Sequence, residues 1–274
     1  MTETLERKMV QLQQALQALH PLAVAFSGGV DSSLLLAAAV DALGRDVLAV
    51  TAVSPLHPRR ETRLAIALAG DLGVRHLLLR SDEMGQDLFT ANPPDRCYHC
   101  KRGLLGQIWQ AVRRRGYTHL VHGANRDDLG DYRPGQRAAR EMAVMAPLID
   151  VGLDKGEIRA LAQRRGLPNW NQPSMACLAS RIPHGTPITA ARLAQIEAAE
   201  EYLQDKGFRG PRVRWHGEVA RIECRDEETQ RILSDEMRRE IAAHLKALGF
   251  RFVTVDLEGY RMGSLNPEQP DSPG

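Results

Sequence analysis

Two patterns alternate along most of the chain: short, mostly apolar runs, and longer segments in which apolar residues recur at helical spacing. The short runs predict buried strands at residues 22–26, 46–53, 74–79 and 118–122, and the longer segments predict helices that include residues 3–19, 34–40 and 60–72. Because strands and helices alternate with short breaks, we expect a Rossmann-like α/β fold, with a parallel sheet covered by helices on both faces. Ligands of such sheets bind beyond the carboxyl ends of the strands.

The composition changes after Pro187 and predicts a second, smaller α/β domain. Its expected elements are helices at 189–206 and 227–248, a hairpin of strands 212–215 and 218–224, and a last strand at 250–257. We therefore predict domains at residues 1–186 and 187–262, followed by a disordered tail at 263–274.

The first hairpin strand of this second domain carries Arg212 and Arg214 on one face. Two guanidinium groups about 7 Å apart can bind phosphate or carboxylate, although an ordinary solvated face has the same pattern. Cys224 shares the apolar face of the second strand and is expected in the core.

The first strand runs directly into the sequence SGGVDSS and then into an apolar helix. Gly28 and Gly29 permit a tight turn that brings backbone N–H groups to an anion, and the next helix points its positive end at the same place. The serine hydroxyls add donors, and Asp31 can hold a magnesium ion that bridges phosphate oxygens. The loop is neither a Walker A loop nor a dinucleotide-binding turn. With the ends of two other strands, it predicts a nucleotide site formed by Ala25, Phe26, Ser27, Gly28, Gly29, Val30, Asp31, Ser32, Ser33, Ala52, Gly123 and Asn125.

A polar loop follows the strand at 118–122 and is expected at the same sheet edge. Its acids include Asp127 and Asp128, which are either plain loop acids or, in the case of Asp128, a group that binds magnesium or orients the nucleotide. Asp154 and Glu157 form a capping box for the next helix, which we interpret as scaffold.

Charge and cysteine content narrow the function. The 274 residues carry 36 basic and 34 acidic side chains, a net charge of +2 that does not require a nucleic-acid partner. No apolar run approaches the ~20 residues of a membrane helix, and the first residues do not resemble a signal peptide, so we expect a cytosolic protein. In a reducing compartment, four cysteines favour metal binding or catalysis over disulfides.

Two irregular loops carry the cysteines of interest. Cys97 and Cys100 lie in NPPDRCYHCK, where two prolines place Cys97 in a loop or first helical turn. This spacing suits zinc, a redox dithiol, an iron–sulfur cluster or no function at all. Cys177, in PSMACLASRIP, lies between prolines beside Ser180 and Arg181, a setting that suits an exposed functional thiol better than a core residue.

Four motifs together resemble one family. SGGVDSS, NPPDRCYHCK, GANRDDLGDYRPGQ and PSMACLASRIPHG, in this order, are similar to the motifs of LarE-type sulfur transferases, which belong to the N-type ATP pyrophosphatases (adenine nucleotide alpha-hydrolase-like fold). The likeness covers roughly residues 3–262. It implies a role in the synthesis of the nickel-pincer nucleotide cofactor, with pyridinium-3,5-dicarboxylate mononucleotide as substrate. It also implies a homo-oligomer.

The resemblance implies a mechanism and residue roles. ATP and Mg²⁺ bind at the SGGVDSS loop, a substrate carboxylate is adenylated with release of pyrophosphate, and a sulfur nucleophile displaces AMP. By the same resemblance, Lys101 is the active-site lysine, Ser180 and Arg181 hold the substrate, and Arg212 and Arg214 bind its phosphate. Glu223 matches a carboxylate implicated in metal binding, but Arg231, where a partner acid is expected, makes this site doubtful.

The resemblance and the number of cysteines together suggest where the transferred sulfur comes from. Some members sacrifice the sulfur of one cysteine, which matches Cys177, and leave dehydroalanine. Here Cys97, Cys100 and Cys177 together are expected to hold a [4Fe-4S] cluster whose open iron binds a transferable sulfide. The sulfide donor is not identified by the sequence.

Two other functions fit parts of the pattern. A tRNA-thiolating enzyme of the same superfamily can also carry three cysteines, but the charge excess is small and no RNA-binding module is evident. A nucleotide-binding iron–sulfur sensor without turnover belongs to another class. An amidating ligase would leave the cysteines without a role.

Overall fold

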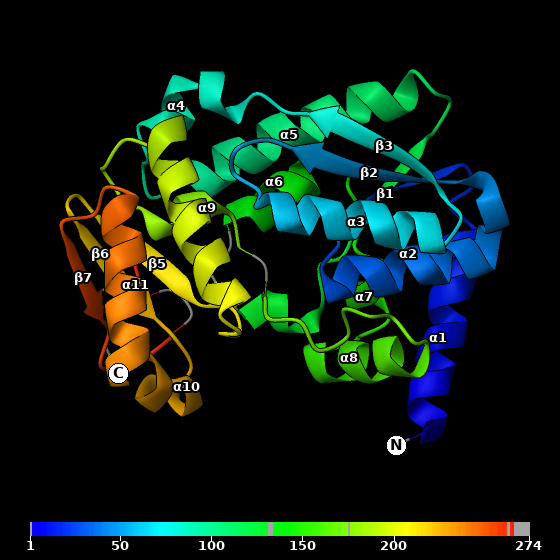
Figure 1. The fold of residues 1–274 in the computed structure, drawn as a ribbon. Coiled ribbons are helices and arrows are strands. Elements are labelled where there is room, and N and C mark those ends of the chain that lie inside the picture. Colours follow the sequence, from blue (N-terminus) through cyan, green and yellow to red (C-terminus); the bar gives the residue numbers. More distant parts are fainter. Residues whose placement is uncertain (1, 131–133, 175, 262–263, 266–274) are drawn as a thin grey trace, which may run out of the picture. The chain divides into compact units, whose positions relative to one another are not determined.

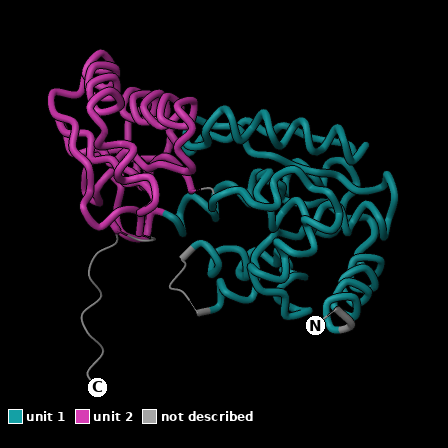
Figure 2. The backbone as a smooth tube through the Cα atoms, turned by 60° about the horizontal axis from the view of Figure 1, so that its bottom comes forward, with its two compact units in different colours: residues 1–83, 97–175 teal, residues 84–96, 176–274 magenta. Residues whose placement is uncertain are grey.

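The computed structural model describes residues 2–130, 134–174, 176–261 and 264–265 (Figure 1). Contacts divide the chain into two compact units, unit 1 with residues 1–83 and 97–175, and unit 2 with residues 84–96 and 176–274 (Figure 2). The domain boundaries predicted from the sequence remain a prediction. Most of the predicted disordered tail lies outside the described residues.

Unit 1 is built on a parallel sheet with strand order β3-β2-β1-β4. Its strands are β1 (Leu22–Ala25), β2 (Val47–Val53), β3 (Arg75–Arg80) and β4 (His119–His122). Its helices are α1 (Thr2–Gln17), α2 (Val30–Leu43), α3 (Arg59–Asp71), α5 (Arg96–Arg113), α6 (Pro134–Glu141), α7 (Pro147–Asp150) and α8 (Lys155–Arg164). The 3₁₀ turns η1 (Gly44–Asp46) and η3 (Arg126–Gly130) complete it.

The helices cover both faces of this sheet, as Figure 1 shows. On one face Leu22 and Val24 of β1 pack with helices α1, α2, α3 and α8 in one apolar core. On the other face Ala23 and Val50 pack with helices α5 and α6 in a second core. Alternate residues of β1 therefore point to opposite faces of the sheet and pack in different cores. The predicted α/β fold is confirmed.

Unit 2 contains a small mixed sheet with strand order β5-β6-β7. Its strands are β5 (Arg212–His216), β6 (Val219–Glu223) and β7 (Phe252–Val255), and β5 and β6 form the predicted hairpin. Its helices are α4 (Asp87–Thr90), α9 (Ala190–Asp205), α10 (Asp226–Ile232) and α11 (Asp235–Ala247), with the 3₁₀ turn η4 (Leu178–Arg181). A further 3₁₀ turn, η2 (Glu83–Gly85), spans the boundary between the units. Cys224 is 1% exposed in the core of unit 2, as predicted.

Helix α5 begins at Arg96, just after the prolines at 93 and 94, as expected for Cys97 in a loop or first helical turn. One element prediction needed correction. The single helix predicted at 227–248 is two helices, α10 and α11, separated at Leu233 and Ser234, where Ser234 has extended backbone angles. Within the described residues, no helix is both long and apolar enough to cross a membrane.

Candidate nucleotide and substrate sites

The loop between β1 and α2 is held in a tight turn by its own polar groups. Gly28 has a φ of +81°, a conformation that side chains disfavour, and a Cβ there would meet Ala65 at 3.0 Å. The Ser32 hydroxyl donates to the Gly29 carbonyl at 3.0 Å. Helix α2 begins at Val30, and its N-cap residue Gly29 provides no side-chain cap, so the N-terminus of the helix suits an anion.

Two residues far along the chain hold this loop in place. The buried amide Nδ2 of Asn169 donates to the Gly28 carbonyl at 2.7 Å and to the Ser33 hydroxyl at 2.8 Å. At Gly123, after β4, a Cβ would lie 2.7 Å from the Ser32 nitrogen, so only glycine permits this approach. The carboxyl end of β4 therefore contacts the phosphate loop directly.

Asp31 faces a cation and a second acid. Lys155, the first residue of α8, places its ammonium 2.5 Å from Asp31 Oδ2, while the buried Oδ1 has no hydrogen-bond partner among the described residues. Burial raises the pKa of Asp31 above its usual value, Lys155 opposes this rise, and the nearby charge of Asp128 adds to it. Asp128 itself accepts a hydrogen bond from the Asn125 backbone at 2.9 Å. Asp31 and Asp128 thus lie close enough to influence one another electrostatically.

Lys101 lies at the same edge of the sheet. Burial lowers the pKa of its ammonium, and the negative charge of Cys100 in its thiolate form opposes this change. Burial and the charge of Lys101 lower the pKa of His122, at the end of β4, to about 3. His57, after β2, also has a lowered pKa, mainly because of burial and opposed by Glu83, with Lys101 lowering it further. Lys101 therefore lies among neutral imidazoles at the carboxyl ends of β2 and β4.

The carbonyl of Phe26, just before the loop, is fixed by a short chain of hydrogen bonds. The Thr51 hydroxyl donates to this carbonyl at 2.7 Å and pairs with His76 Nε2 at 2.8 Å. Since Thr51 uses its proton on Phe26, Nε2 of His76 is the donor in the second bond. This arrangement fixes the ends of β1 and β2, where Ala25 and Ala52 were predicted to contact the nucleotide.

The cysteines of the two predicted loops belong to different units. Cys97 is exposed and lies in the first turn of α5, as the sequence predicted, and Cys100 is half-buried and lies about one turn further along the helix. Cys177 is half-buried and precedes η4 in unit 2. Among the described residues no group of three histidines, cysteines or acids forms a metal site, so the three-cysteine cluster stays a prediction.

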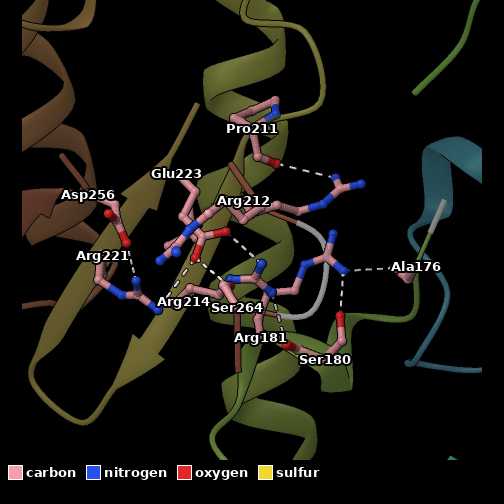
Figure 3. Close-up of polar contacts among 12 residues, drawn as sticks. Ala176, Ser180, Arg181, Pro211, Arg212, Arg214, Arg221, Glu223, Asp256 and Ser264 are labelled. Carbon is pink, nitrogen blue, oxygen red and sulfur yellow. Dashed lines mark hydrogen bonds and ion pairs between the residues drawn. The ribbon is translucent and has the colours of Figure 1, made fainter. Parts of the chain in front are cut away.

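Unit 2 holds the predicted arginines in a buried polar cluster, seen in Figure 3. Arg181, which is 1% exposed, forms a bidentate ion pair with Glu200 at 2.8 and 2.9 Å. Its Nη1 also donates to the carbonyls of Ala176 and Cys177 and to the Ser180 hydroxyl. The backbone on either side of Cys177 is thereby attached to one rigid guanidinium group.

The hairpin arginines continue this cluster. Arg214 pairs with the fully buried Glu223 at 2.6 Å and donates to the Ser180 carbonyl at 3.0 Å, while its Nε has no hydrogen-bond partner among the described residues (Figure 3). Arg212 lies 4.0 Å from Glu200, and burial and the charge of Arg181 lower its pKa. Because both arginines are almost fully buried, the solvated-face alternative is wrong. Three guanidinium groups here face two carboxylates, which leaves an excess of positive charge.

Glu223 is surrounded by donors. Besides Arg214, it contacts Arg221 at 3.4 Å and the Ser264 hydroxyl at 2.7 Å. Arg231 donates to the backbone carbonyls of Lys206 and Gly207 and lies over the Phe208 ring. Both oxygens of Glu223 are therefore engaged by protein donors, an arrangement that does not fit a metal ligand.

Sequence reasoning missed several of these positions. Lys155, Asn169 and Glu200 were not predicted, and the helix that begins at Lys155 was interpreted only as scaffold. Its capping box is present as predicted, but its first residue also supplies the cation for Asp31. The position of Lys155 directly after the helix cap Asp154 was the one sequence feature that could have pointed to this role. The roles predicted for the other site residues remain predictions.

The fold and the loop define a class. A parallel sheet whose first strand runs through SGGVDSS into a helix is the α/β architecture of PP-loop proteins, which use ATP. Residues 8–107 match the model of the asparagine synthase family.

Three relatives refine this class. The pyridinium-3,5-bisthiocarboxylic acid mononucleotide synthase of Lactiplantibacillus plantarum is 39% identical over 266 residues, which cover 96% of this chain and 95% of the relative. An uncharacterized protein of Synechocystis is 40% identical over 262 residues, 96% and 98% of the two chains. A tRNA-specific 2-thiouridylase of Pelobacter propionicus is 30% identical over 186 residues, but these cover only 54% of this chain and 50% of the relative. The chain belongs to the pyridinium-3,5-bisthiocarboxylic acid mononucleotide synthase family, and the family predicted from the four motifs is confirmed.

Proposed function

We propose that this chain is an ATP-dependent sulfurtransferase that adenylates the carboxylates of pyridinium-3,5-dicarboxylate mononucleotide and converts them to thiocarboxylates. The observation that carries the proposal is the environment of Asp31. A buried carboxylate oxygen without a partner lies beside an ammonium group and a phosphate-binding turn. Such a group suits a site that receives a metal-bound polyphosphate.

The residues around Asp31 fit Mg²⁺. Oδ1 of Asp31 is an available hard oxygen ligand, and Asp128 supplies a second carboxylate nearby. Magnesium bound by these residues would neutralise charge on the phosphate oxygens. If Asp31 held the metal, the ammonium of Lys155 would be able to contact the pyrophosphate that leaves.

The adenylation step is assigned to residues of unit 1. A substrate carboxylate oxygen attacks the α-phosphorus, the bond between that phosphorus and the bridging oxygen breaks, and pyrophosphate takes the electron pair. The amides of the first turn of α2 and Lys155 stabilise the charge that develops on the pyrophosphate. Lys101 stabilises charge on the acyl phosphate.

The buried arginines of unit 2 are the proposed site for the phosphate of the substrate. Arg181 is held by Glu200 and Arg214 by Glu223, so their guanidinium groups are fixed before a ligand arrives. The excess of positive charge, together with the available Nε of Arg214, favours an anion. Ser180 would add a hydroxyl group.

Sulfur transfer is assigned to the cysteines. Two thiols on one helical turn, Cys97 and Cys100, suit a shared metal centre, and Cys177 would be the third ligand. When bound, a [4Fe-4S] cluster supplies a transferable sulfide. In the alternative route Cys177 gives up its own sulfur. In both routes a sulfur atom bonds to the activated carbonyl carbon, the bond from that carbon to the AMP oxygen breaks, and AMP leaves.

Exchange of pyrophosphate into ATP tests the adenylation step. We expect exchange that requires both Mg²⁺ and the dicarboxylate mononucleotide. Exchange stimulated by tRNA instead would favour the tRNA-thiolating alternative, and nucleotide binding without exchange would favour a sensor.

Iron analysis tests the sulfur source. We expect the anaerobically purified chain to contain ~4 iron atoms, and Cys97→Ala, Cys100→Ala and Cys177→Ala to lose them. Cys224→Ala is the matched control because this thiol lies in the core of unit 2 beside Thr229. Iron retained by Cys97→Ala would contradict the cluster, and conversion of Cys177 to dehydroalanine during turnover would support the sacrificial route. We also expect a cytosolic homo-oligomer, which sedimentation and cell fractionation would check.

A further inference from the structure

Asp127 lies in the 3₁₀ turn η3 of unit 1 and binds the start of helix α8 in the same unit. Its Oδ2 accepts a hydrogen bond from the backbone amide of Lys155 at 3.0 Å. Lys155 is the first residue of α8, so this amide has no acceptor within the helix itself. An exposed acid 28 residues earlier in the chain therefore caps the backbone of the residue whose ammonium pairs with Asp31.

Two further contacts attach the same turn to the start of α8. The amide of Arg126 donates to the Leu153 carbonyl at 2.9 Å, and its guanidinium group contacts the carboxylate of Asp154, the N-cap of the helix, at 2.6 Å. The turn is thus connected to the helix through both backbone and side chains. We call these contacts, together with the hydrogen bond from Lys155 to Asp127, the η3–α8 junction.

The turn that carries Asp127 is held by its own polar groups. The side-chain oxygen of the buried Asn125 accepts from the Asp127 amide at 3.0 Å. The backbone of Asn125 binds Asp128 twice, through its amide at 2.9 Å and its carbonyl at 3.1 Å. Gln136 of α6 donates to the Asp128 carbonyl at 3.0 Å. These contacts fix the backbone from which the Asp127 carboxylate reaches α8.

Adjacent residues of this turn are therefore connected to Asp31 by two different routes. Burial raises the pKa of Asp31 most, the charge of Asp128 adds to this rise, and Lys155 opposes it. Asp128 acts directly, through its own charge. Asp127 holds the backbone of Lys155, and the place that a flexible lysine side chain reaches depends on where its backbone is fixed.

We propose that Asp127 is a positioning residue that keeps the Lys155 ammonium on Asp31 by binding the backbone amide of Lys155. This proposal rests on the proposed function, in which Asp31 and Lys155 receive the metal-bound polyphosphate of ATP. Asp127 takes no part in the reaction itself, and its effect passes through Lys155. The sequence alone suggested only a plain loop acid at this position.

Acylation of lysine is the test, and it needs neither nucleotide nor turnover. The full chain is treated briefly with acetic anhydride, and acetylation of Lys155 and Lys8 is measured by mass spectrometry. Only the free amine reacts, so an ammonium held in an ion pair is protected. We expect Lys155 to react about fivefold faster in Asp127→Ala than in the unaltered protein, because a hydrogen bond of ordinary strength is lost.

Two controls separate the position of Lys155 from the stability of α8. Lys8 is the internal control, because it forms an ion pair with another residue of α8 at 2.7 Å and so reports on the helix. Asp41→Ala is the matched control variant, since Asp41 is an aspartate that binds Arg165 at the other end of α8. We expect parental reactivity of both lysines in Asp41→Ala, and of Lys8 in Asp127→Ala.

Two further variants test the hydrogen bond itself. Asp127→Asn keeps an oxygen acceptor but loses the charge, so we expect Lys155 to stay protected. Asp127→Leu has a similar size but no acceptor, and it decides the question if Asp127→Ala does not fold.

A double-mutant cycle in pyrophosphate exchange gives a second measurement. At low ATP, Asp127→Ala should lower exchange about fivefold in the unaltered protein but not in Lys155→Met, because Asp127 acts only through Lys155. The acidic limb of the rate profile should also move to higher pH in Asp127→Ala. Asp128 and Arg159, whose charges also act on Asp31, are present in all these variants.

The outcomes are distinct. Parental reactivity of Lys155 in Asp127→Ala, or loss of its protection in Asp127→Asn, would overturn the role of Asp127. A joint rise of Lys8 and Lys155 would show a general loosening of α8 and would overturn it too, as would an equal loss of exchange from Asp127→Ala in Lys155→Met. Absence of exchange in the unaltered protein would overturn the proposed function, whereas acylation would still decide whether Asp127 positions Lys155.

Discussion

The ammonium group of Lys155 lies 2.5 Å from the carboxylate of Asp31, although 124 residues separate them in the sequence. Asp31 belongs to the first turn after the phosphate loop, and Lys155 is the first residue of α8. The chain thus supplies, from a distant helix, the cation that its loop lacks when compared with a Walker A sequence. Lys155 also supplies a counter-charge for the Asp31 carboxylate, which would otherwise be buried without one.

Replacing Lys155 with methionine should weaken the use of ATP. A charge-assisted hydrogen bond contributes about 1.5–3 kcal/mol, so we expect the rate of pyrophosphate exchange at low ATP to fall about 10- to 100-fold. Lys8→Met is the control, because Lys8 pairs with Glu157 of the same helix at 2.7 Å but does not contact Asp31. Equal losses in the two variants would mean that Lys155 only stabilises α8.

The same substitution should change the pH dependence of the reaction. Asp31 must be ionised to hold magnesium, burial raises its pKa, and Lys155 partly reverses this rise. Without Lys155 the pKa rises further, so the acidic limb of the rate profile should move to higher pH. Profiles of Lys155→Met and Lys8→Met at saturating Mg²⁺ would measure the shift. An acidic limb at the parental position would show that Asp31 does not control it.

The contrast between Lys155 and the strands shows what sequence patterns can predict. β1, β2 and β4 were located correctly because each is a short, mostly apolar run whose central residues are buried in a parallel sheet. The capping box of Asp154 was also found, because Asp154 and its partner Glu157 are close together in the sequence. The contacts of Lys155 with Asp31 and of Asn169 with Gly28 join distant segments, and no local pattern specifies them. Likewise, Glu200 occupies a position on α9 that resembles any solvated acid, yet it is buried against Arg181.

The Arg181–Glu200 pair should contribute to stability as well as to binding. Arg181→Met leaves Glu200 buried without its main counter-charge, so we expect the free energy of unfolding to fall by about 3–5 kcal/mol. Arg238→Met breaks an exposed pair with Asp235 and should change it by less than about 1 kcal/mol. Urea unfolding would measure both. A small effect in Arg181→Met would mean that Arg212 alone can neutralise Glu200.

The stability effect should depend on pH. Burial alone would raise the pKa of Glu200, but Arg181 and Arg212 bring it below its usual value. An acid with a lowered pKa stabilises the folded state above its unfolded-state pKa, and this contribution is lost as the pH falls through the folded-state value. The difference between parent and Arg181→Met should therefore shrink in acid, and urea unfolding at graded pH would show it.

Lys101 and Cys100, adjacent in the first turns of α5, should titrate together. Burial lowers the pKa of Lys101, and the Cys100 thiolate opposes this effect. Removing the thiolate in Cys100→Ser should therefore lower the pKa of Lys101 further, so that the amine becomes reactive at lower pH. Acylation at graded pH, with the modified lysine identified by mass spectrometry, would measure the midpoint.

Cys224→Ser is the control, because this cysteine lies in the core of unit 2 and does not act on Lys101. A midpoint unchanged in Cys100→Ser would mean that Cys100 is not a thiolate beside the amine. The direction of the shift matters for the chemistry. A lysine whose charge is maintained by a thiolate stays cationic while that thiolate is present, and it can then stabilise an acyl phosphate during adenylation. Consumption or oxidation of the thiolate would weaken that charge, which would couple the state of the sulfur centre to the activation of the carboxylate.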